Sequence, residues 1–323
     1  MKKELRIVFL GTPDFAVESL RAIHESGRKV VGVITSPDRQ AGRGRKVQQS
    51  AVKKYAVEAG LPMLQPTNLK DPDFQEELKA LKADLQIVVA FRMLPEAVWN
   101  MPPLGTFNLH ASLLPQYRGA APINWAIING EKKSGVTTFF LQHKIDTGDI
   151  LFQEEVELDD KETAGSLHNK LMEVGAKLVI KTLNAIEHGD YQEKPQNDLI
   201  AKGTTIAEAP KIFRQDCQIN WNLEADVVDR LIRGLAPYPA AWTKIKHQED
   251  DKVLNLKVYQ IEIKSSTLAL KAGELNVQDG EILVGTAIQT VSFTDLQLEG
   301  KKRMKAKELL NGFDFSNYQI IQS

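Results

Sequence analysis

The sequence contains very little cysteine and no excess of charge of either sign. Its 323 residues include one cysteine, Cys217, which excludes an internal disulfide framework and a metal site built from several thiolates. Lysine and arginine number 41 against 42 acidic residues, so the chain as a whole has no field that attracts a polyanion. Any nucleic-acid site must therefore be a local cluster of positive charge, and we expect no DNA partner.

Long hydrophobic runs are also missing. No run of about 18 consecutive apolar residues occurs, which is the length that a membrane-spanning helix needs. The amino-terminal strand-like segment reaches Gly11-Thr12-Pro13-Asp14 too early to be a signal peptide. We therefore expect a cytoplasmic protein without membrane contact, and we expect it to be a monomer.

The first 189 residues alternate between strand-like and helix-like patterns. Apolar strand-like runs lie at 5–11, 30–36, 85–91, 105–112 and 135–142. Apolar residues at helical spacing occur at 13–26, 49–59, 72–82, 121–129 and 163–187. This alternation predicts an α/β fold with a Rossmann-like, mostly parallel sheet, whose ligands bind outside the carboxyl ends of the strands. The first strand-to-helix turn lacks a G-x-G-x-x-G motif, so we do not predict NAD binding.

The sequence pattern changes after residue 189. A polar stretch without periodicity predicts a linker at 190–206. A helix is expected at 223–234, followed by short β-like runs at 241–247, 253–263, 281–290 and 292–298. We therefore expect a catalytic domain at 1–189 and a smaller, OB-like β-barrel of five or six strands at 207–323. Trp125, Trp221 and Trp242 are interpreted as core anchors.

An amide and an imidazole share one strand in the first domain. Asn108 and His110 are two residues apart and so point to the same face, near the carboxyl end of the strand at 105–112. Asp146 lies in a turn after the next strand, which ends near Gln142, and we expect it beside the same end of the sheet. The plainest interpretation is that these groups only satisfy neighbouring loops.

Two chemical roles also fit Asn108, His110 and Asp146. They could stabilise an oxyanion and move one proton during attack of an amine on an activated formyl carbon, because no serine or cysteine nucleophile accompanies them. A metal site is the alternative, but asparagine is a poor ligand and no His or Cys spacing supports it, so we predict no metal.

Two segments carry a resemblance to a known family. "FNLHASLLPQYRGAAPINW" (107–125) and "IDTGDIL" (145–151) resemble the 10-formyltetrahydrofolate-dependent formyltransferases, and the similarity extends from "FLGTPDFA" to about residue 188. The resemblance implies that Asn108, His110 and Asp146 are the catalytic trio and that 10-formyltetrahydrofolate is the co-substrate. It implies a folate site lined by Ser112, Leu113, Leu114, Pro115, Phe91, Arg92, Leu94 and Asp149.

One segment departs from the family pattern. Phe91 and Arg92 stand in "VVAFRMLP", where the family has a Tyr-Gly pair in "VVAYG-x-ILP". The backbone of this segment is expected to meet the pterin ring through main-chain hydrogen bonds. Phe91 and Leu94 can equally be core residues.

The acceptor of the formyl group is suggested by a basic loop and by the second domain. "TSPDRQAGRGRKVQQS" (35–50) resembles a loop that enters the acceptor stem in the family members that formylate initiator methionyl-tRNA. The family resemblance continues more weakly through "INWN" (219–222) and "RGLAPYPAAW" (233–242). The expected tRNA contacts are Arg39, Arg43, Arg45, Lys46, Lys202, Lys211, Lys301, Lys302 and Arg303.

Alternatives stay open for each of these features. Residues 35–50 and 301–307 can be solvated basic surface without a ligand. Formylation of a small amine, such as an amino sugar-nucleotide or glycinamide ribotide, needs neither the basic loop nor the barrel. A non-catalytic RNA-binding protein is disfavoured by the presence of Asn108, His110 and Asp146.

Overall fold

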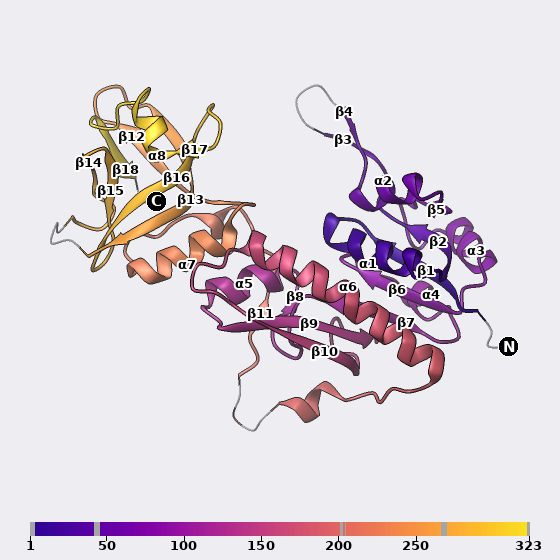
Figure 1. Cartoon of the computed structure of the whole chain (residues 1–323). Coiled ribbons are helices and arrows are strands. Elements are labelled where there is room, and N and C mark those ends of the chain that lie inside the picture. The colour runs from indigo at the N-terminus through magenta and orange to yellow at the C-terminus, as the bar shows by residue number, and fades with distance from the viewer. Residues whose placement is uncertain (1–3, 42–45, 201–202, 204, 266–269, 322–323) are drawn as a thin grey trace. The chain divides into compact units, whose positions relative to one another are not determined.

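The computed structural model describes residues 4–41, 46–200, 203, 205–265 and 270–321. The chain forms two compact units (Figure 1). The first unit contains residues 1–122, 133–157 and 168–209, and the second contains 123–132, 158–167 and 210–323. The second unit thus takes two short segments from the amino-terminal part of the chain, and the contiguous domain bounds expected from the sequence stay a prediction.

The first unit is built on one seven-stranded sheet. In spatial order its strands are β10 (Ile150–Glu157), β9 (Lys133–Phe140), β7 (Thr106–His110), β6 (Leu85–Val89), β1 (Arg6–Gly11), β2 (Lys29–Ile34) and β5 (Met63–Leu64). The five strands from β7 to β5 are parallel, whereas β9 is antiparallel to both of its neighbours. The predicted mostly parallel, Rossmann-like sheet is therefore confirmed.

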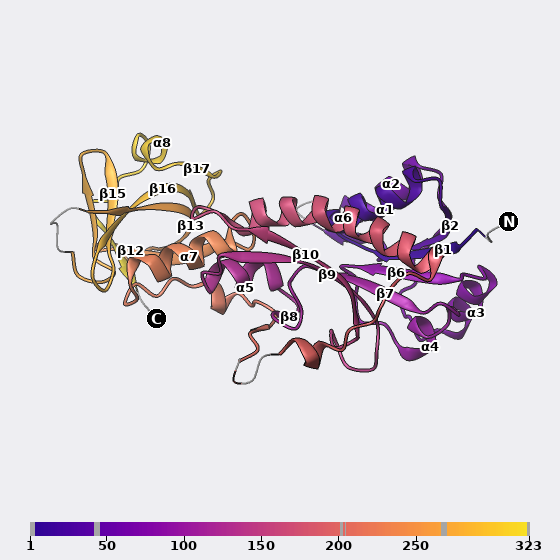
Figure 2. The same ribbon diagram turned by 60° about the horizontal axis from the view of Figure 1, so that its bottom comes forward.

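Helices cover both faces of this sheet, which explains its continuous apolar runs. Figure 2 shows α1 (Asp14–Glu25) and α6 (Ala164–His188) on one face, with α3 (Pro72–Ala80) and α4 (Glu96–Trp99) on the other. The helix α2 (Ala51–Glu58) begins after Ser50, whose side chain caps it by accepting a hydrogen bond from Lys53 N. Residues 7–10 of β1 are fully buried, as expected for a parallel strand with helices above and below it.

Short elements occupy the segments that the sequence predicts as loops. The basic loop contains a small hairpin of β3 (Arg39–Ala41) and β4 (Lys46–Gln48). The expected linker contains a 3₁₀ turn, η1 (Gln196–Leu199), and Lys194 forms an antiparallel bridge with Ile150. Just after it, β11 (Glu208–Ala209) pairs with β8 (Arg118–Gly119). The expected linker thus contributes ordered structure to the first unit.

The second unit contains a curved antiparallel sheet together with short helices. Its strands follow the order β14 (Leu275–Gln278), β15 (Glu281–Gly285), β16 (Thr290–Leu298), β13 (Val253–Lys264), β12 (Ala241–His247) and β18 (Tyr318–Ile321), and β17 (Met304–Lys305) pairs with β16. The helices are α5 (Pro122–Ile128), α7 (Ala225–Leu235) and α8 (Ala306–Leu310), with a 3₁₀ turn, η2, at Gln215–Cys217. The edge strands β14 and β18 approach each other, so the sheet is nearly closed and barrel-like.

The predicted β-barrel-like architecture is confirmed, but the predicted number of strands is wrong. The sheet has seven strands in the described part of the chain rather than five or six, because β14, β17 and β18 have only two to four residues and leave no readable periodicity. Trp221 is fully buried in the core, where its ring lies 5.8 Å from that of Phe293. Cys217 is also buried, and burial raises the pKa of its thiol, so it is a core residue.

Candidate active site

The strand β7 holds an imidazole at its carboxyl end. Leu109 points toward α6, where a Cβ on Gly175 would come within 2.7 Å of its Cδ2. Asn108 and His110 therefore point to the opposite face, as the alternation of a strand requires. His110 is buried, and its Nε2 lies 2.9 Å from the carbonyl oxygen of Tyr117. Because a carbonyl only accepts, Nε2 carries a proton, and Nδ1 is the nitrogen that faces the rest of the site.

The carboxylate of Asp146 faces this nitrogen. Its Oδ2 lies 4.0 Å from Nδ1 of His110 and accepts a hydrogen bond of 3.0 Å from the backbone N–H of Gly119. The Asp146 side chain is 14% exposed, so the pair lies in a largely dry environment where electrostatic interactions are strong. A separation of 4.0 Å exceeds a hydrogen bond, and Nδ1 is therefore not committed to Asp146.

Asp146 reaches His110 by a route that differs from the sequence prediction. The strand β9 runs antiparallel to β7 and ends with Phe140 opposite Phe107, at the amino end of β7. The loop after β9 therefore starts at the wrong end and must run back about 10 Å along β7 to bring Asp146 beside His110. The backbone of Asp146 is left-handed (φ 53°), a conformation that Asp tolerates better than most residues. Asp146 therefore lies beside His110, as the sequence analysis expects, although the strand that precedes it ends at the opposite end of β7.

Asn108 completes the arrangement as a half-buried amide on the same strand face as His110. An amide N–H₂ donates hydrogen bonds, and Nδ1 of an imidazole can donate or accept according to whether it carries a proton. The three groups can therefore stabilise a negatively charged oxygen and relay one proton.

The Ser112–Pro115 turn is held mainly by internal contacts. Ser112 and Leu114 are each 2% exposed. The Ser112 hydroxyl donates to the carbonyl of Gln116, and the Thr137 hydroxyl donates to the carbonyl of Ser112. Leu114 packs against buried apolar residues of β9 and β10, and Pro115 is buried as well. Only Leu113 is half-exposed, so any side-chain contact with folate from this turn is expected mainly at Leu113.

The segment after β6 contains two core residues and an arginine held by a hydrogen bond. Phe91 and Leu94 are partly buried and pack against the core between β1 and α3. Arg92 donates to the carbonyl of Thr67 (2.9 Å), and its guanidinium lies over the ring of Phe91 at 5.7 Å. Burial lowers the pKa of Arg92, and the positive charge of Arg39 lowers it further. Their roles at the pterin ring stay predictions.

Asp149 lies at the end of the same loop as Asp146. It is half-buried, and its Oδ2 lies 3.4 Å from the Gln142 side-chain amide. Its contact with folate also stays a prediction.

One residue of this site was missed by the sequence analysis. Gln196, in the segment expected to be a linker, binds the backbone of the Asp146 loop and the side chain of Arg118. A glutamine in a polar, aperiodic stretch carries no sequence signal of burial, and only the bridge between Lys194 and Ile150 brings it to the site.

The expected tRNA contacts have different surroundings. Arg43, Arg45, Lys202 and the side chain of Lys46 lie outside the described residues. Arg39 is exposed, and Lys302 is exposed in the barrel unit. The Lys211 ammonium lies 5.4 Å from the ring of Phe213.

Arg303 and Lys301 already have protein partners. Arg303 forms a two-point ion pair with Asp295 (2.9 and 3.1 Å) and lies 4.1 Å over the ring of Tyr259. The Lys301 ammonium is 3.4 Å from the carbonyl of Gly312. Arg303 is thus partly neutralised, whereas Lys302 offers an exposed charge.

The barrel unit also presents a basic and aromatic cluster that the sequence analysis did not single out. Trp242 is half-exposed rather than a fully buried anchor, and the charged groups of Arg214 and Lys244 lie 5.7 and 5.9 Å from its ring. Lys257 is the residue opposite Trp242 on β13. We call these four residues the Trp242 cluster. Cationic and aromatic side chains together form a surface that suits single-stranded or stem nucleotides.

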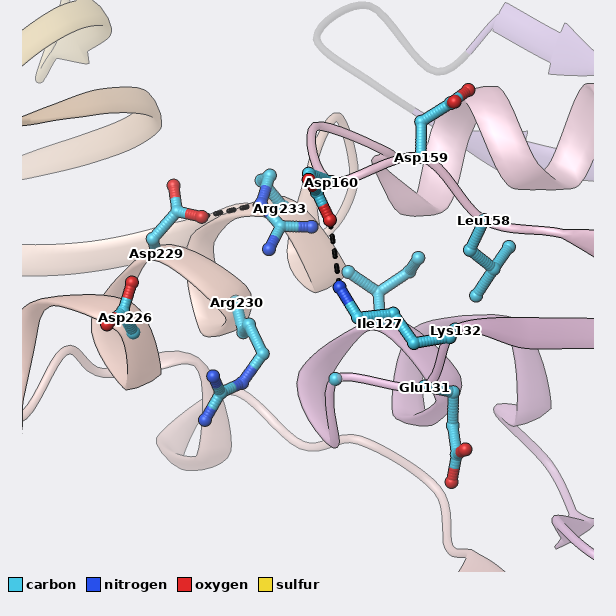
Figure 3. A pocket seen from close by; sticks show the side chains of 11 residues that line it. Ile127, Glu131, Lys132, Leu158, Asp159, Asp160, Asp226, Asp229, Arg230 and Arg233 are labelled. Carbon is cyan, nitrogen blue, oxygen red and sulfur yellow. Dashed lines mark hydrogen bonds and ion pairs between the residues drawn. The ribbon is translucent and has the colours of Figure 1, made fainter.

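A separate cavity of about 290 Å³ lies within the second unit (Figure 3). Its lining is strongly charged, and two of its cations are paired with its own acids, Lys132 with Asp160 (2.8 Å) and Arg233 with Asp229 (2.6 Å). The hydrogen bond from Lys132 lowers the pKa of Asp160. Two of the lining cations are thus neutralised by lining acids, and we assign the cavity no ligand.

The described residues contain no group of three or more His, Cys, Asp or Glu side chains placed to hold a metal ion. Within the same described ranges, no helix has the length and apolar character to cross a membrane.

Comparison with known proteins identifies the protein family. The family model described as formyl transferase matches residues 5–183, and the family model described as formyl transferase, C-terminal domain, matches residues 211–314. The chain belongs to the formyl transferase family.

Individual proteins and solved structures are also similar to this chain. The chain is 52% identical to the methionyl-tRNA formyltransferase of Bacteroides fragilis and 54% identical to that of Parabacteroides distasonis, with 97% of each chain covered in both cases. Among solved structures, HypX from Aquifex aeolicus in complex with tetrahydrofolic acid matches with a TM-score of 0.63 at 18% identity, covering 99% of this chain and 51% of HypX. An N-formyltransferase from Helicobacter canadensis matches with a TM-score of 0.62 at 18% identity, covering 90% and 99% of the two chains. The structural matches establish the fold.

Proposed function

We propose that this protein transfers the formyl group of 10-formyltetrahydrofolate to the α-amino group of methionine on initiator tRNA, for translation initiation. The observation that carries the chemistry is the facing of His110 Nδ1 and Asp146 Oδ2 at 4.0 Å, on the strand face that also bears Asn108. The substrate is supported by the two methionyl-tRNA formyltransferases that are 52% and 54% identical over nearly the whole chain.

The reaction requires one bond to form and one to break at the formyl carbon. The neutral amine of methionine attacks this carbon, and the carbonyl oxygen becomes an oxyanion. The Asn108 amide and Nδ1–H of the doubly protonated imidazole donate to that oxygen, while Nε2–H keeps donating to the carbonyl of Tyr117. The amine loses a proton, the bond from the formyl carbon to N10 of the folate breaks, and N10 gains a proton, which leaves tetrahydrofolate.

Asp146 serves this reaction in two ways. When Nδ1 carries a proton, the carboxylate 4.0 Å away attracts it, which orients the imidazole and offsets the positive charge on the ring. It also helps to pass the proton from the amine. Because the amine must be neutral, we expect the rate to fall as the pH is lowered through the pKa of the substrate amino group.

The tRNA is proposed to bind through clusters of positive charge rather than through the whole surface. The basic loop at 35–50 would meet the acceptor stem, and the barrel would contribute Lys211, Lys302 and the Trp242 cluster. The cytoplasmic location, the monomeric state and the lack of a DNA or membrane partner stay predictions from the sequence.

The test is a formylation assay with 10-formyltetrahydrofolate and three acceptors. We expect rapid transfer to charged initiator tRNA and negligible transfer to free methionine or to an amino sugar-nucleotide.

The Arg43→Ala variant should raise the KM for the tRNA several-fold and leave the KM for the folate unchanged. Efficient transfer to the sugar nucleotide, with no use of the tRNA, would establish the small-amine alternative instead.

A further inference from the structure

Gln196 has an unusual environment for a residue between two domains. Its side chain is 2% exposed, and every hydrogen-bonding capacity of its amide is used. The N–H₂ group donates to the carbonyl of Asp146 (2.9 Å) and to that of Gly148 (2.8 Å). The oxygen accepts two hydrogen bonds from the guanidinium of Arg118, at 3.0 and 2.6 Å.

The backbone on both sides of the contact fixes its position. Lys194 and Ile150 exchange two hydrogen bonds of 2.9 Å each, which attach this segment to the first residue of β10. Gln196 follows two residues later, at the start of η1. It is therefore anchored beside the point where the Asp146 loop ends.

The Asp146 loop needs such an anchor. From Leu141 to Asp149 it belongs to no strand, so its carbonyls cannot be satisfied by a regular ladder. It also passes very close to β9, because a Cβ on Gly148 would lie only 1.7 Å from the carbonyl oxygen of Phe140. One side-chain amide thus fixes two carbonyls of a tight, folded-back loop.

The oxygen of the Gln196 amide binds a residue that adjoins the donor to the Asp146 carboxylate. Arg118 is followed by Gly119, whose N–H donates to Oδ2 of Asp146. The backbone of Asp146 is therefore held by Gln196 and its carboxylate by Gly119, the residue next to the arginine that Gln196 binds.

We propose that Gln196 is a positioning residue that sets the distance between the Asp146 carboxylate and His110 during formyl transfer. The inference rests on the proposed function. It predicts that removing the two donors to the loop slows the chemical step while folate binding persists.

The decisive variant is Gln196→Glu. A carboxylate still accepts from Arg118 and keeps the side-chain volume, but it cannot donate to the carbonyls of Asp146 and Gly148. We expect kcat to fall by about 10- to 100-fold in Gln196→Glu and in Gln196→Ala, since a misplacement of about 1 Å can cost that much. The KM for the folate should change less than about threefold, because the substitution removes no contact that binds the folate equally in the ground state and the transition state.

The matched control is Gln192→Ala, an exposed glutamine of the same segment, which should behave as wild type. Wild-type transfer to initiator tRNA is measured first, so its absence counts against the proposed function and not against Gln196. If Gln196→Ala does not fold, as judged by circular dichroism, Gln196→Glu carries the test.

A double-mutant cycle separates positioning from general stability. In an Asp146→Ala background, Gln196→Glu should lower kcat by less than about twofold further, because the group that it positions is gone. Full additivity of the two losses would overturn the inference, and so would a folded Gln196→Glu variant with wild-type kcat.

Discussion

The end of β7 and the charged surface of the barrel use polar groups in opposite ways. At β7 few groups are involved, they are buried or half-buried, and two of them are fixed by backbone contacts: Nε2 of His110 by the carbonyl of Tyr117, and Oδ2 of Asp146 by the N–H of Gly119. On the barrel the charges are more numerous and more exposed, and some are neutralised by neighbours, as Arg303 is by Asp295. Chemistry at one carbon demands fixed geometry, whereas attraction of a polyanion needs only charge of the right sign at the surface.

The contrast implies that single substitutions act unequally in the two regions. Loss of one fixed donor at β7 removes a specific interaction with the transition state, while loss of one surface cation removes a fraction of a shared electrostatic attraction. We therefore expect the effects to decrease from a substitution at β7 to one on the barrel surface.

The largest effect is expected for His110→Ala. The variant loses the donor to the developing oxyanion, which typically costs about 2.7–4 kcal/mol, or about 100- to 1,000-fold in kcat. Single-turnover formylation of charged initiator tRNA measures this directly. His143→Ala is the control, because His143 is a histidine of the same unit whose side chain is 74% exposed. A folded His110→Ala variant with near wild-type turnover would remove the catalytic assignment.

A smaller effect is expected when Lys244 of the Trp242 cluster is replaced by alanine. The KM for tRNA should rise a few-fold with kcat and the folate KM unchanged, and the slope of log affinity against log salt should fall by about 1. Lys264→Ala is the matched control on the same barrel, since its ammonium is already paired with Glu281 at 2.8 Å. Equal salt slopes for wild type and Lys244→Ala would exclude this cluster from the tRNA surface.

The smallest effect concerns the stability of the barrel. Burial by itself would raise the pKa of Asp295, but hydrogen bonds from Arg303 and Lys305 more than offset it, and the pKa is lowered. A lowered pKa in the folded state gives stability that is present above the unfolded pKa of about 3.9 and is lost as the pH falls through the folded value.

Asp295→Asn should therefore cost about 1 kcal/mol in the free energy of unfolding near pH 7, a modest value because both cations are exposed. The difference from wild type should shrink below about pH 4, where the wild-type carboxylate also becomes neutral. Urea unfolding of the whole chain at pH 7 and pH 3 measures both values. A difference that stays constant over this range would show that the ion pair does not stabilise the barrel.

Much of the fold could be predicted because its information is local. The apolar run at 85–91 appears as β6, and the helical spacing at 163–187 appears as α6, each within a few residues. The two-residue spacing of Asn108 and His110 already implied a shared strand face. The short strands β17 and β18 could not be found, because two to four residues carry no period and pair only with partners that the rest of the fold supplies.

The sequence by itself determined which side chains are available and where along each strand they stand. The tertiary structure alone decided that the loop after β9 returns along β7, that Asp146 faces His110, and that Gln196 holds the loop in place. The physical reason is that alternation and helical spacing are set by neighbours in sequence. The approach of residues 36 and 50 positions apart is set instead by strand order, close backbone packing and the need to satisfy buried carbonyls.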